Sequence, residues 1–199
     1  MREFDIEPAT AEHAEALAEL FERADSPCYC QYWQFVGDHR DWQNRCANKR
    51  SVNRSSLARD LEQGVLHGLV AIAEDDQSVL GWVRLERPEH MAKSYQGRLY
   101  RGLPCLQGER SRVWAVACFL VDPDERRRGI ATFLLEAAVD HARTLGATSL
   151  EGLPRGATDT SDGEQWTGPW MMYDRAGFEK IHDFAPYPVF RLALDAAED

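Results

Sequence analysis

Three consecutive arginines stand directly before a glycine in the segment Arg126-Arg127-Arg128-Gly129-Ile130-Ala131-Thr132. Arginine side chains attract phosphates. A glycine has no Cβ, so the backbone can turn sharply there and come close to an anion. Three positive charges at the start of a helix oppose the helix dipole, and a bound polyanion would remove that conflict. The segment therefore indicates a phosphate-binding loop.

The elements on either side would hold this loop in place. Val113–Val121 is nearly all apolar, and its length and β-branched residues predict a buried strand. After the loop we expect a helix closed by Gly146. Its inner side would carry six apolar residues, Phe133, Leu134, Leu135, Ala138, Val139 and Ala142. In a strand, loop and helix of this order, amides of the first helical turn have no partner within the helix and favour a phosphate.

Composition limits the class of protein. The 199 residues, 44% of them hydrophobic, suit a single domain over residues 1–199. A net charge of −10 argues against nucleic acid as a partner. The chain has no apolar run long enough to span a membrane, and its N-terminus has no apolar signal core, so we expect a cytoplasmic protein without a membrane partner.

Patterns elsewhere predict a mixed α/β protein. We expect strands at Arg2–Glu7, His67–Ala73, Val79–Leu85 and Thr148–Leu153, the middle two as a hairpin. A helix from Thr10 to about Ala24 and one or two polar helices over Asp41–Gln63 complete the N-terminal part. Arg87–Gly108 reads as a long loop, and loops of that length are often functional.

Two groups of residues leave alternatives open. The aromatic stretch Cys28–Phe35 either lines a ligand pocket or forms a short helix that packs into the core. Cys28, Cys30, His39 and Cys46 could be drawn as a zinc site, but the spacing matches no common zinc pattern. We expect reduced thiols and no metal.

Two motifs resemble signatures of the GNAT superfamily of acyl-CoA-dependent N-acetyltransferases. Arg126-x-x-Gly129-x-Ala131, after an apolar strand ending in Val-Asp-Pro, is similar to its acyl-CoA signature. Tyr173-x-x-x-Gly177-Phe178 resembles the second signature, where a helix ends and leads into a strand, here Glu179–Phe184. The residue sequence at positions 166–173 is similar to that of a bacterial subgroup of the superfamily whose substrates are largely unassigned.

The resemblance implies a fold and a co-substrate. The fold would be a central mixed, mostly antiparallel sheet of about six to seven strands flanked by helices. Two parallel strands, Val113–Val121 and Thr148–Leu153, would splay apart to bind acetyl-CoA. The backbone of Phe119, Leu120 and Val121 would pair with the pantetheine arm. The pyrophosphate would be held by the loop amides of Arg126, Arg127, Arg128, Gly129, Ile130, Ala131 and Thr132.

The resemblance also implies the chemistry, in which an amine attacks the thioester directly. Tyr173 would act as the acid for the leaving thiolate, or only pack and position the co-substrate. Glu151 would act as the base, or as a structural hydrogen-bond acceptor, and Glu86 is a weaker candidate base. A nucleophilic role for Cys118 is disfavoured by its apolar strand and the lack of an evident His partner.

The acceptor is open on sequence alone. A small-molecule amine is the leading expectation, because the aromatic stretch and the 87–108 loop would cover a pocket. The alternatives are a protein or peptide N-acetyltransferase and a non-catalytic acyl-CoA sensor. Since GNAT proteins are often dimers, the resemblance also leaves a homodimer open.

Overall fold

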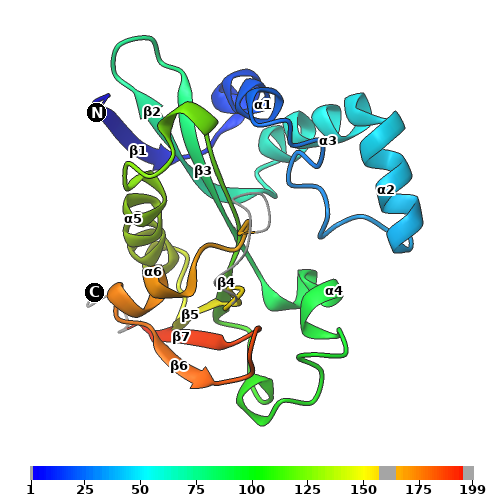
Figure 1. Cartoon of the computed structure of the whole chain (residues 1–199), viewed down its shortest axis with the longest axis vertical. Helices are drawn as coiled ribbons and strands as arrows, with labels where there is room; N and C mark the ends of the chain where they lie inside the picture. The colour runs from blue at the N-terminus through cyan, green and yellow to red at the C-terminus, as the bar shows by residue number, and fades with distance from the viewer. Residues whose placement is uncertain (1, 157–164, 195–199) are drawn as a thin grey trace. The chain divides into compact units, whose positions relative to one another are not determined.

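The computed structural model describes residues 2–156 and 165–194. Within them, seven strands form one sheet in the order β1-β2-β3-β4-β5-β7-β6 (Figure 1). The strands are β1 Phe4–Pro8, β2 His67–Ala73, β3 Val79–Glu86, β4 Val113–Val121, β5 Ser149–Gly152, β6 Glu179–His182 and β7 Val189–Ala193.

The pairing of these strands agrees with the predicted fold class. β4 and β5 run parallel, whereas β1–β2, β5–β7 and β6–β7 are antiparallel. The β4–β5 register stops at Val116 and Gly152, although β4 continues to Val121. The prediction of a mixed, mostly antiparallel sheet of six to seven strands flanked by helices is confirmed.

Six α-helices and four short 3-10 helices accompany the sheet in the described part of the chain. The α-helices are α1 Ala14–Arg23, α2 His39–Asn48, α3 Arg50–Glu62, α4 Ala92–Tyr95, α5 Ile130–Thr144 and α6 Trp170–Arg175. Short 3-10 helices are η1 Ala11–His13, η2 Pro88–His90, η3 Pro104–Leu106 and η4 Pro123–Glu125. Among the residues described, no helix is both long and apolar enough to cross a bilayer.

The chain divides into two compact units, each built from two separate stretches. The first unit is Met1–Arg84 with Leu120–Leu134, and the second is Leu85–Phe119 with Leu135–Asp199. That the whole chain is one domain stays a prediction.

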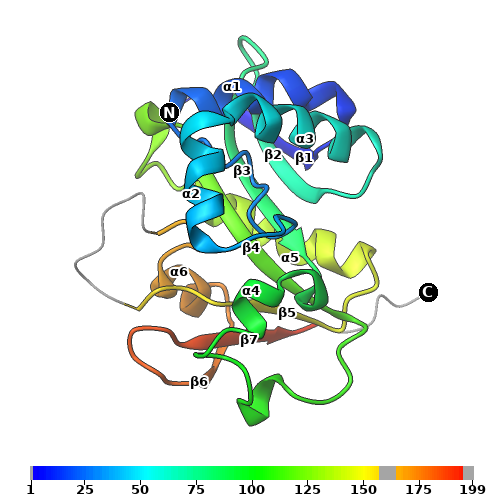
Figure 2. The ribbon, with the colours of Figure 1, turned by 90° about the vertical axis from the view of Figure 1, so that its right-hand side faces the viewer.

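The first unit is built on the β1–β2 pair and on helices α1 to α3. α1 buries a face of Leu17, Leu20 and Phe21, residues at helical spacing that are at most 1% exposed. It packs against α3 (Figure 2). The two polar helices and the 67–73 strand agree with the sequence patterns.

The aromatic stretch Cys28–Phe35 forms turns, so the expected alternative of a short helix is wrong. Tyr29 and Cys30 have φ values of 44° and 57°, a left-handed backbone that no α-helix contains. The Tyr29 ring stacks on Phe21 at 5.3 Å, and Cys30 Sγ accepts a hydrogen bond from Trp82 Nε1 at 3.3 Å. The stretch is therefore held by side-chain packing within the first unit.

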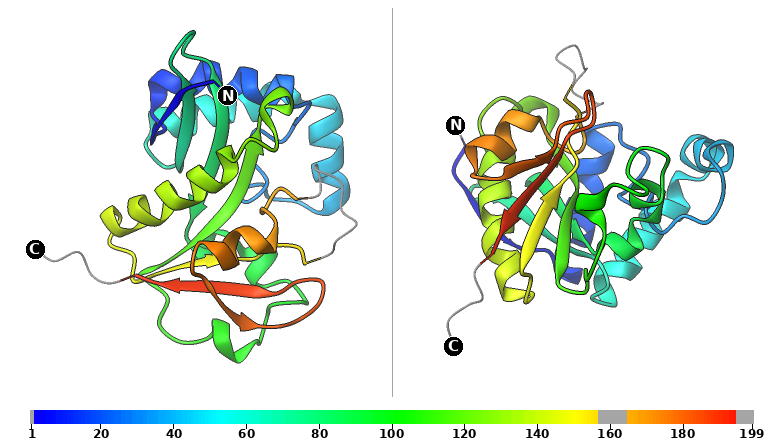
Figure 3. Two further views of the ribbon diagram at one scale, coloured as in Figure 1. Left: turned by 60° about the vertical axis from the view of Figure 1, so that its left-hand side comes forward. Right: turned by 90° about the horizontal axis from the view of Figure 1, so that it is seen from below.

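The second unit contains β5, β6, β7 and α6 (Figure 3). Gly177, with φ of +83°, ends the α6 segment as predicted, and Phe178 behind it is 3% exposed. The 87–108 segment is not a plain loop, because it contains η2, α4 and η3. The sequence patterns did not identify β7, which completes the sheet beside β5.

One residue predicted on the inner side of α5 lies outside. Phe133 is 45% exposed, and its ring makes an edge contact with Phe4 at 5.9 Å between ring centroids. The other five predicted residues, Leu134, Leu135, Ala138, Val139 and Ala142, are buried. Position 133 lies at the margin of the apolar stripe, where sequence spacing alone does not separate the two faces.

Candidate active site

The loop of three arginines lies between β4 and α5, as the sequence predicted. Asp122 at its start is buried and accepts hydrogen bonds from Arg23 Nε at 2.6 Å and from the Asp124 N–H at 3.0 Å. Arg128 pairs with the buried Glu125 at 2.7 Å, and Arg126 Nε lies 3.3 Å from the Val121 carbonyl oxygen. These contacts fix the loop at both ends.

The loop backbone has the conformation that an anion site requires. Arg127 and Gly129 have φ of 62° and 86°, so left-handed residues recur within the turn before α5. Such turns aim successive N–H groups at one point. Thr132 N–H already donates to the Gly129 carbonyl at 2.8 Å, whereas the N–H groups of Ile130 and Ala131 precede any intrahelical acceptor.

A glycine that the sequence analysis did not single out positions the start of α5. A Cβ added at Gly81, on β3, would lie 2.7 Å from Cγ2 of Ile130 and 3.0 Å from Cδ1 of Leu134. The helix can approach the strand this closely only because position 81 has no side chain. In the sequence, the only sign of this close approach is that a glycine interrupts the apolar residues of the strand.

Tyr173 on α6 is completely buried in the second unit. Its hydroxyl donates to the Thr167 carbonyl at 2.7 Å, and its ring packs edge-on against Phe178 at 5.2 Å. A Cβ at Gly152 would lie 2.2 Å from Tyr173 Cε1, so the ring lies directly over the end of β5. Burial, with a smaller effect of the nearby Cys118 thiol, raises the pKa of Tyr173. The hydroxyl therefore keeps its proton at neutral pH.

Phe119 on β4 has its backbone N–H engaged as well. It donates to the Trp166 carbonyl at 2.6 Å. The Phe119 ring also borders Gly168, at 3.2 Å from the position of an added Cβ. The sequence analysis assigned the Phe119 backbone and the Tyr173 hydroxyl to the co-substrate. In the structure, the Phe119 N–H and the Tyr173 hydroxyl donate to the consecutive carbonyls of Trp166 and Thr167. If the pantetheine arm paired with the N–H of Phe119, the bond from that N–H to the Trp166 carbonyl would first have to break.

Glu151 on β5 is completely buried and bound by three side chains. Oε2 accepts from Tyr95 at 2.7 Å and from Arg110 at 2.6 Å. Oε1 accepts from Arg191, at 3.0 Å from Nε and 2.6 Å from Nη2. None of the three partners was predicted from the sequence. The strand register places Arg191 beside Glu151, whereas Tyr95 on α4 and Arg110 in a loop reach it through tertiary packing. A proton-accepting role for Glu151 requires one of these bonds to be exchanged.

Glu86, the weaker candidate base, lies at the end of β3 and is 2% exposed. Its Oε1 accepts from the Arg87 N–H at 2.9 Å and lies 3.0 Å from Nδ1 of His90, whose side chain is 60% exposed. The pair links a buried carboxylate to an imidazole at the surface. Such a pair can relay a proton.

The cysteines are free thiols. Burial, followed in size by the effect of Cys30, raises the pKa of Cys28 to about 11. Cys118 is half-buried, and its Sγ donates to the Phe119 carbonyl at 3.5 Å. In the part of the chain that the structure describes, no three His, Cys, Asp or Glu side chains are grouped so as to hold a metal ion.

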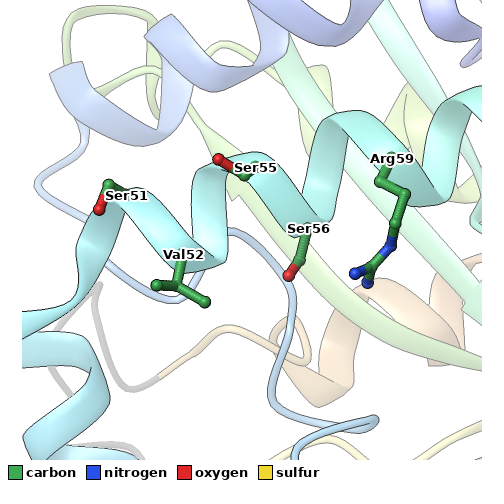
Figure 4. Close-up of a pocket in the computed structure, with 5 residues that line it drawn as sticks. All are labelled: Ser51, Val52, Ser55, Ser56 and Arg59. Carbon is green, nitrogen blue, oxygen red and sulfur yellow. The ribbon is translucent and has the colours of Figure 1, made fainter.

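A pocket lies along α3 (Figure 4). Its lining residues are distant in sequence from the predicted site residues. Three serines, a valine and an arginine line it, namely Ser51, Val52, Ser55, Ser56 and Arg59. Arg59 is engaged there by Asp60 at 2.8 Å. None of the five residues was a predicted site residue.

Residues 14–161 match the model of the acetyltransferase (GNAT) family. The match covers well over half of the chain. The chain belongs to the GNAT acetyltransferase family. It is accordingly an acyltransferase, which confirms the enzyme class predicted from the two motifs. A search of curated proteins found no match.

Solved structures share the fold of this GNAT chain. The PaiA N-acetyltransferase of Thermoplasma acidophilum, in complex with coenzyme A, is 14% identical over 96% of this chain and 99% of its own, with a TM-score of 0.55. A GNAT family N-acetyltransferase of Escherichia coli, also in complex with coenzyme A, is 19% identical over 97% and 83%, with a TM-score of 0.51. The ribosomal-protein-S18-alanine N-acetyltransferase of Escherichia coli is 12% identical over 99% and 96%, with a TM-score of 0.51.

Proposed function

We propose that this GNAT chain transfers an acetyl group from acetyl-CoA to an amine of a small molecule, by direct attack of the amine. The observation that carries the proposal is the loop before α5. Its left-handed residues at Arg127 and Gly129 and the first-turn amides of Ile130 and Ala131 suit a pyrophosphate. Two solved relatives of the same fold contain coenzyme A, which supports the same co-substrate here.

Acetyl-CoA supplies an activated thioester, and the chain's residues would position it and manage the protons. The Arg126–Thr132 loop would hold the pyrophosphate, and the backbone of Phe119, Leu120 and Val121 would pair with the pantetheine arm. Tyr173, kept protonated by burial, would donate its hydroxyl hydrogen to the departing sulfur. To do so, the hydroxyl must turn from the Thr167 carbonyl.

The amine must lose a proton before or during attack. We keep Glu151 as the proposed base and Glu86 as its competitor. Both oxygens of Glu151 already accept hydrogen bonds from guanidiniums. Glu86 has the exposed imidazole of His90 beside it, so a proton taken there has a direct path to solvent.

Direct measurement of binding and turnover tests the proposal. Wild type and Gly129→Glu are compared for coenzyme A binding by calorimetry, and for acetylation of a panel of amines by mass spectrometry. We expect micromolar binding and turnover of at least one amine in wild type, both lost in Gly129→Glu. Binding without turnover across the panel would support the alternative of an acyl-CoA sensor, and acetylation confined to peptides would support a protein acceptor. No binding by wild type contradicts the proposal.

A further inference from the structure

The buried Glu151 is bound by more positive charge than it can balance. Its single carboxylate accepts from the guanidiniums of both Arg110 and Arg191, and from the neutral hydroxyl of Tyr95. Among the described residues, no second carboxylate bonds either guanidinium, so the group carries one positive charge in excess. The nearest acid along the chain, Glu109, binds the backbone N–H of Ser111 at 2.7 Å instead.

Both arginines keep hydrogen-bond donors in reserve. A guanidinium has five N–H donors. Among residues 2–156 and 165–194, the Arg110 side chain donates only to Glu151, through Nη2. Arg191 uses Nε and Nη2, on Glu151 and on the Cys105 carbonyl, which leaves Nη1. The side chains of Arg110 and Arg191 are 19% and 30% exposed, whereas that of Glu151 is not exposed at all.

The two guanidiniums are also held in fixed orientations. Arg110 lies over the Tyr95 ring, 5.2 Å from its centroid, while the Tyr95 hydroxyl binds the same carboxylate. Arg191 is the direct cross-strand partner of Glu151 in the β5–β7 register. Arg110 thus presents oriented donors at Nε and Nη1 that bond no described residue, and Arg191 presents Nη1, and charged N–H donors of this kind bind carboxylate oxygens.

The position of the pair relates it to the proposed reaction. Gly152, which follows Glu151 and is the last residue of β5, is the residue under the Tyr173 ring. Successive residues of a strand face opposite sides of the sheet. Glu151, which the two arginines bind, and Gly152, which lies under the Tyr173 ring, are therefore consecutive residues that face opposite sides of the strand end.

We propose that Arg110 and Arg191 bind a carboxylate of the acceptor, so that the acceptor is an amine that also carries a carboxylate, such as an amino acid. The inference rests on the proposed function and adds the substrate class. Hydrogen bonds to charged groups contribute about 1.5–3 kcal/mol, which corresponds to a preference of roughly 10- to 100-fold in kcat/KM.

Matched pairs of acceptors test it. Amino acids are compared with the same amines lacking the carboxylate, in wild type, in Arg110→Gln and in the control Arg101→Gln. Arg101 is an exposed arginine nine residues before Arg110 in the sequence. In wild type and Arg101→Gln we expect the carboxylate to raise kcat/KM roughly 10- to 100-fold. In Arg110→Gln, kcat/KM for an amino acid divided by kcat/KM for the matching amine should fall close to one. The change should come chiefly from a higher KM for the amino acid, with KM for acetyl-CoA unchanged. Arg110→Lys, which keeps the charge without the fork, should retain part of the preference.

Two results overturn the inference. One is a wild type that acetylates amines without preferring the carboxylate. The other is an equal loss on both members of each pair in Arg110→Gln, which indicates a structural role only. If wild type acetylates nothing, the proposed function fails separately. In that case calorimetry compares the binding of N-acetyl amino acids, which carry a carboxylate, with the binding of the corresponding amides, which do not. Equal binding of the two, or no binding of either, would reject the proposed carboxylate site.

Discussion

The phenolic oxygen of Tyr173 lies 2.7 Å from the carbonyl oxygen of Thr167, and it is the donor in that hydrogen bond. The hydrogen that an acid catalyst would transfer is therefore directed at the backbone in this structure. A structural role and a catalytic role for this hydroxyl make different demands. In a structural role, the hydrogen bond from Tyr173 to the Thr167 carbonyl persists. In a catalytic role, it must break so that the hydroxyl can donate to the leaving sulfur.

Replacement of Tyr173 by Phe separates these roles. The change removes the hydroxyl and leaves the Thr167 carbonyl buried without this donor, which should cost about 1–3 kcal/mol of stability. If Tyr173 is the acid, kcat should fall roughly 100-fold or more with little change in KM for acetyl-CoA. Steady-state kinetics and urea unfolding measure the two effects. A kcat within twofold of wild type would leave Tyr173 only the structural role.

Gly129 should tolerate no side chain without loss of co-substrate binding. Its φ of +86° makes Gly129→Ala cost about 1–2 kcal/mol, although space is available, since an added Cβ would meet nothing nearer than Phe133 at 3.5 Å. We expect coenzyme A binding to weaken about tenfold, because the loop that carries the amides is strained. Gly146→Ala is the matched control, with φ of +74° at the other end of α5. It should lose similar stability while coenzyme A binding stays unchanged, and equal weakening in both variants would argue against a specific loop role.

The position of the Tyr173 ring should depend on the absence of a side chain at Gly152. An added Cβ lies 2.2 Å from Cε1 of that ring, so Gly152→Ala forces the ring or the strand to shift, at a cost of about 1–3 kcal/mol. In a Tyr173→Leu background, the same substitution should cost clearly less, because the conflicting ring is gone. A double-mutant cycle by chemical denaturation measures this coupling. Additive effects would mean that the close approach does not constrain the site.

Cys28 should make the stability of the protein depend on pH in the alkaline range. Its pKa is raised from 9.0 to about 11, so the folded state holds the thiol proton more tightly than the unfolded state. The contribution is fully present below pH 9 and is lost as pH rises toward 11. The unfolding free energy of wild type should therefore decline more steeply over this range than that of Cys28→Ala. Parallel curves would show that Cys28 is not the titrating group.

Sequence patterns predicted the parts of the fold that depend on local chemistry. The strand Val113–Val121 has the predicted bounds because a continuous apolar run between turns has few alternatives. Gly177 and Gly146 end their helices as expected, since both adopt the left-handed conformation that favours glycine. The loop before α5 was located by three arginines and a glycine, whose combination has a direct physical reason.

The features that sequence could not provide depend on contacts between distant segments. Glu151 was identified, but Tyr95, Arg110 and Arg191 were not, because nothing local indicates that a loop and β7 meet β5. Nothing local to Gly81 indicates that Ile130, about 50 residues further along the chain, packs against it. The aromatic stretch forms turns because the packing of its side chains, rather than helix propensity, determines its backbone conformation.

The Phe119 N–H, which donates to the Trp166 carbonyl, cannot serve a second acceptor at the same time. If the pantetheine arm uses that N–H as proposed, binding is available only to the fraction of molecules in which the 166–167 segment has left β4. The apparent dissociation constant then equals the intrinsic one divided by that fraction. Affinity for acetyl-CoA becomes adjustable by substitutions around Trp166 that never touch the ligand.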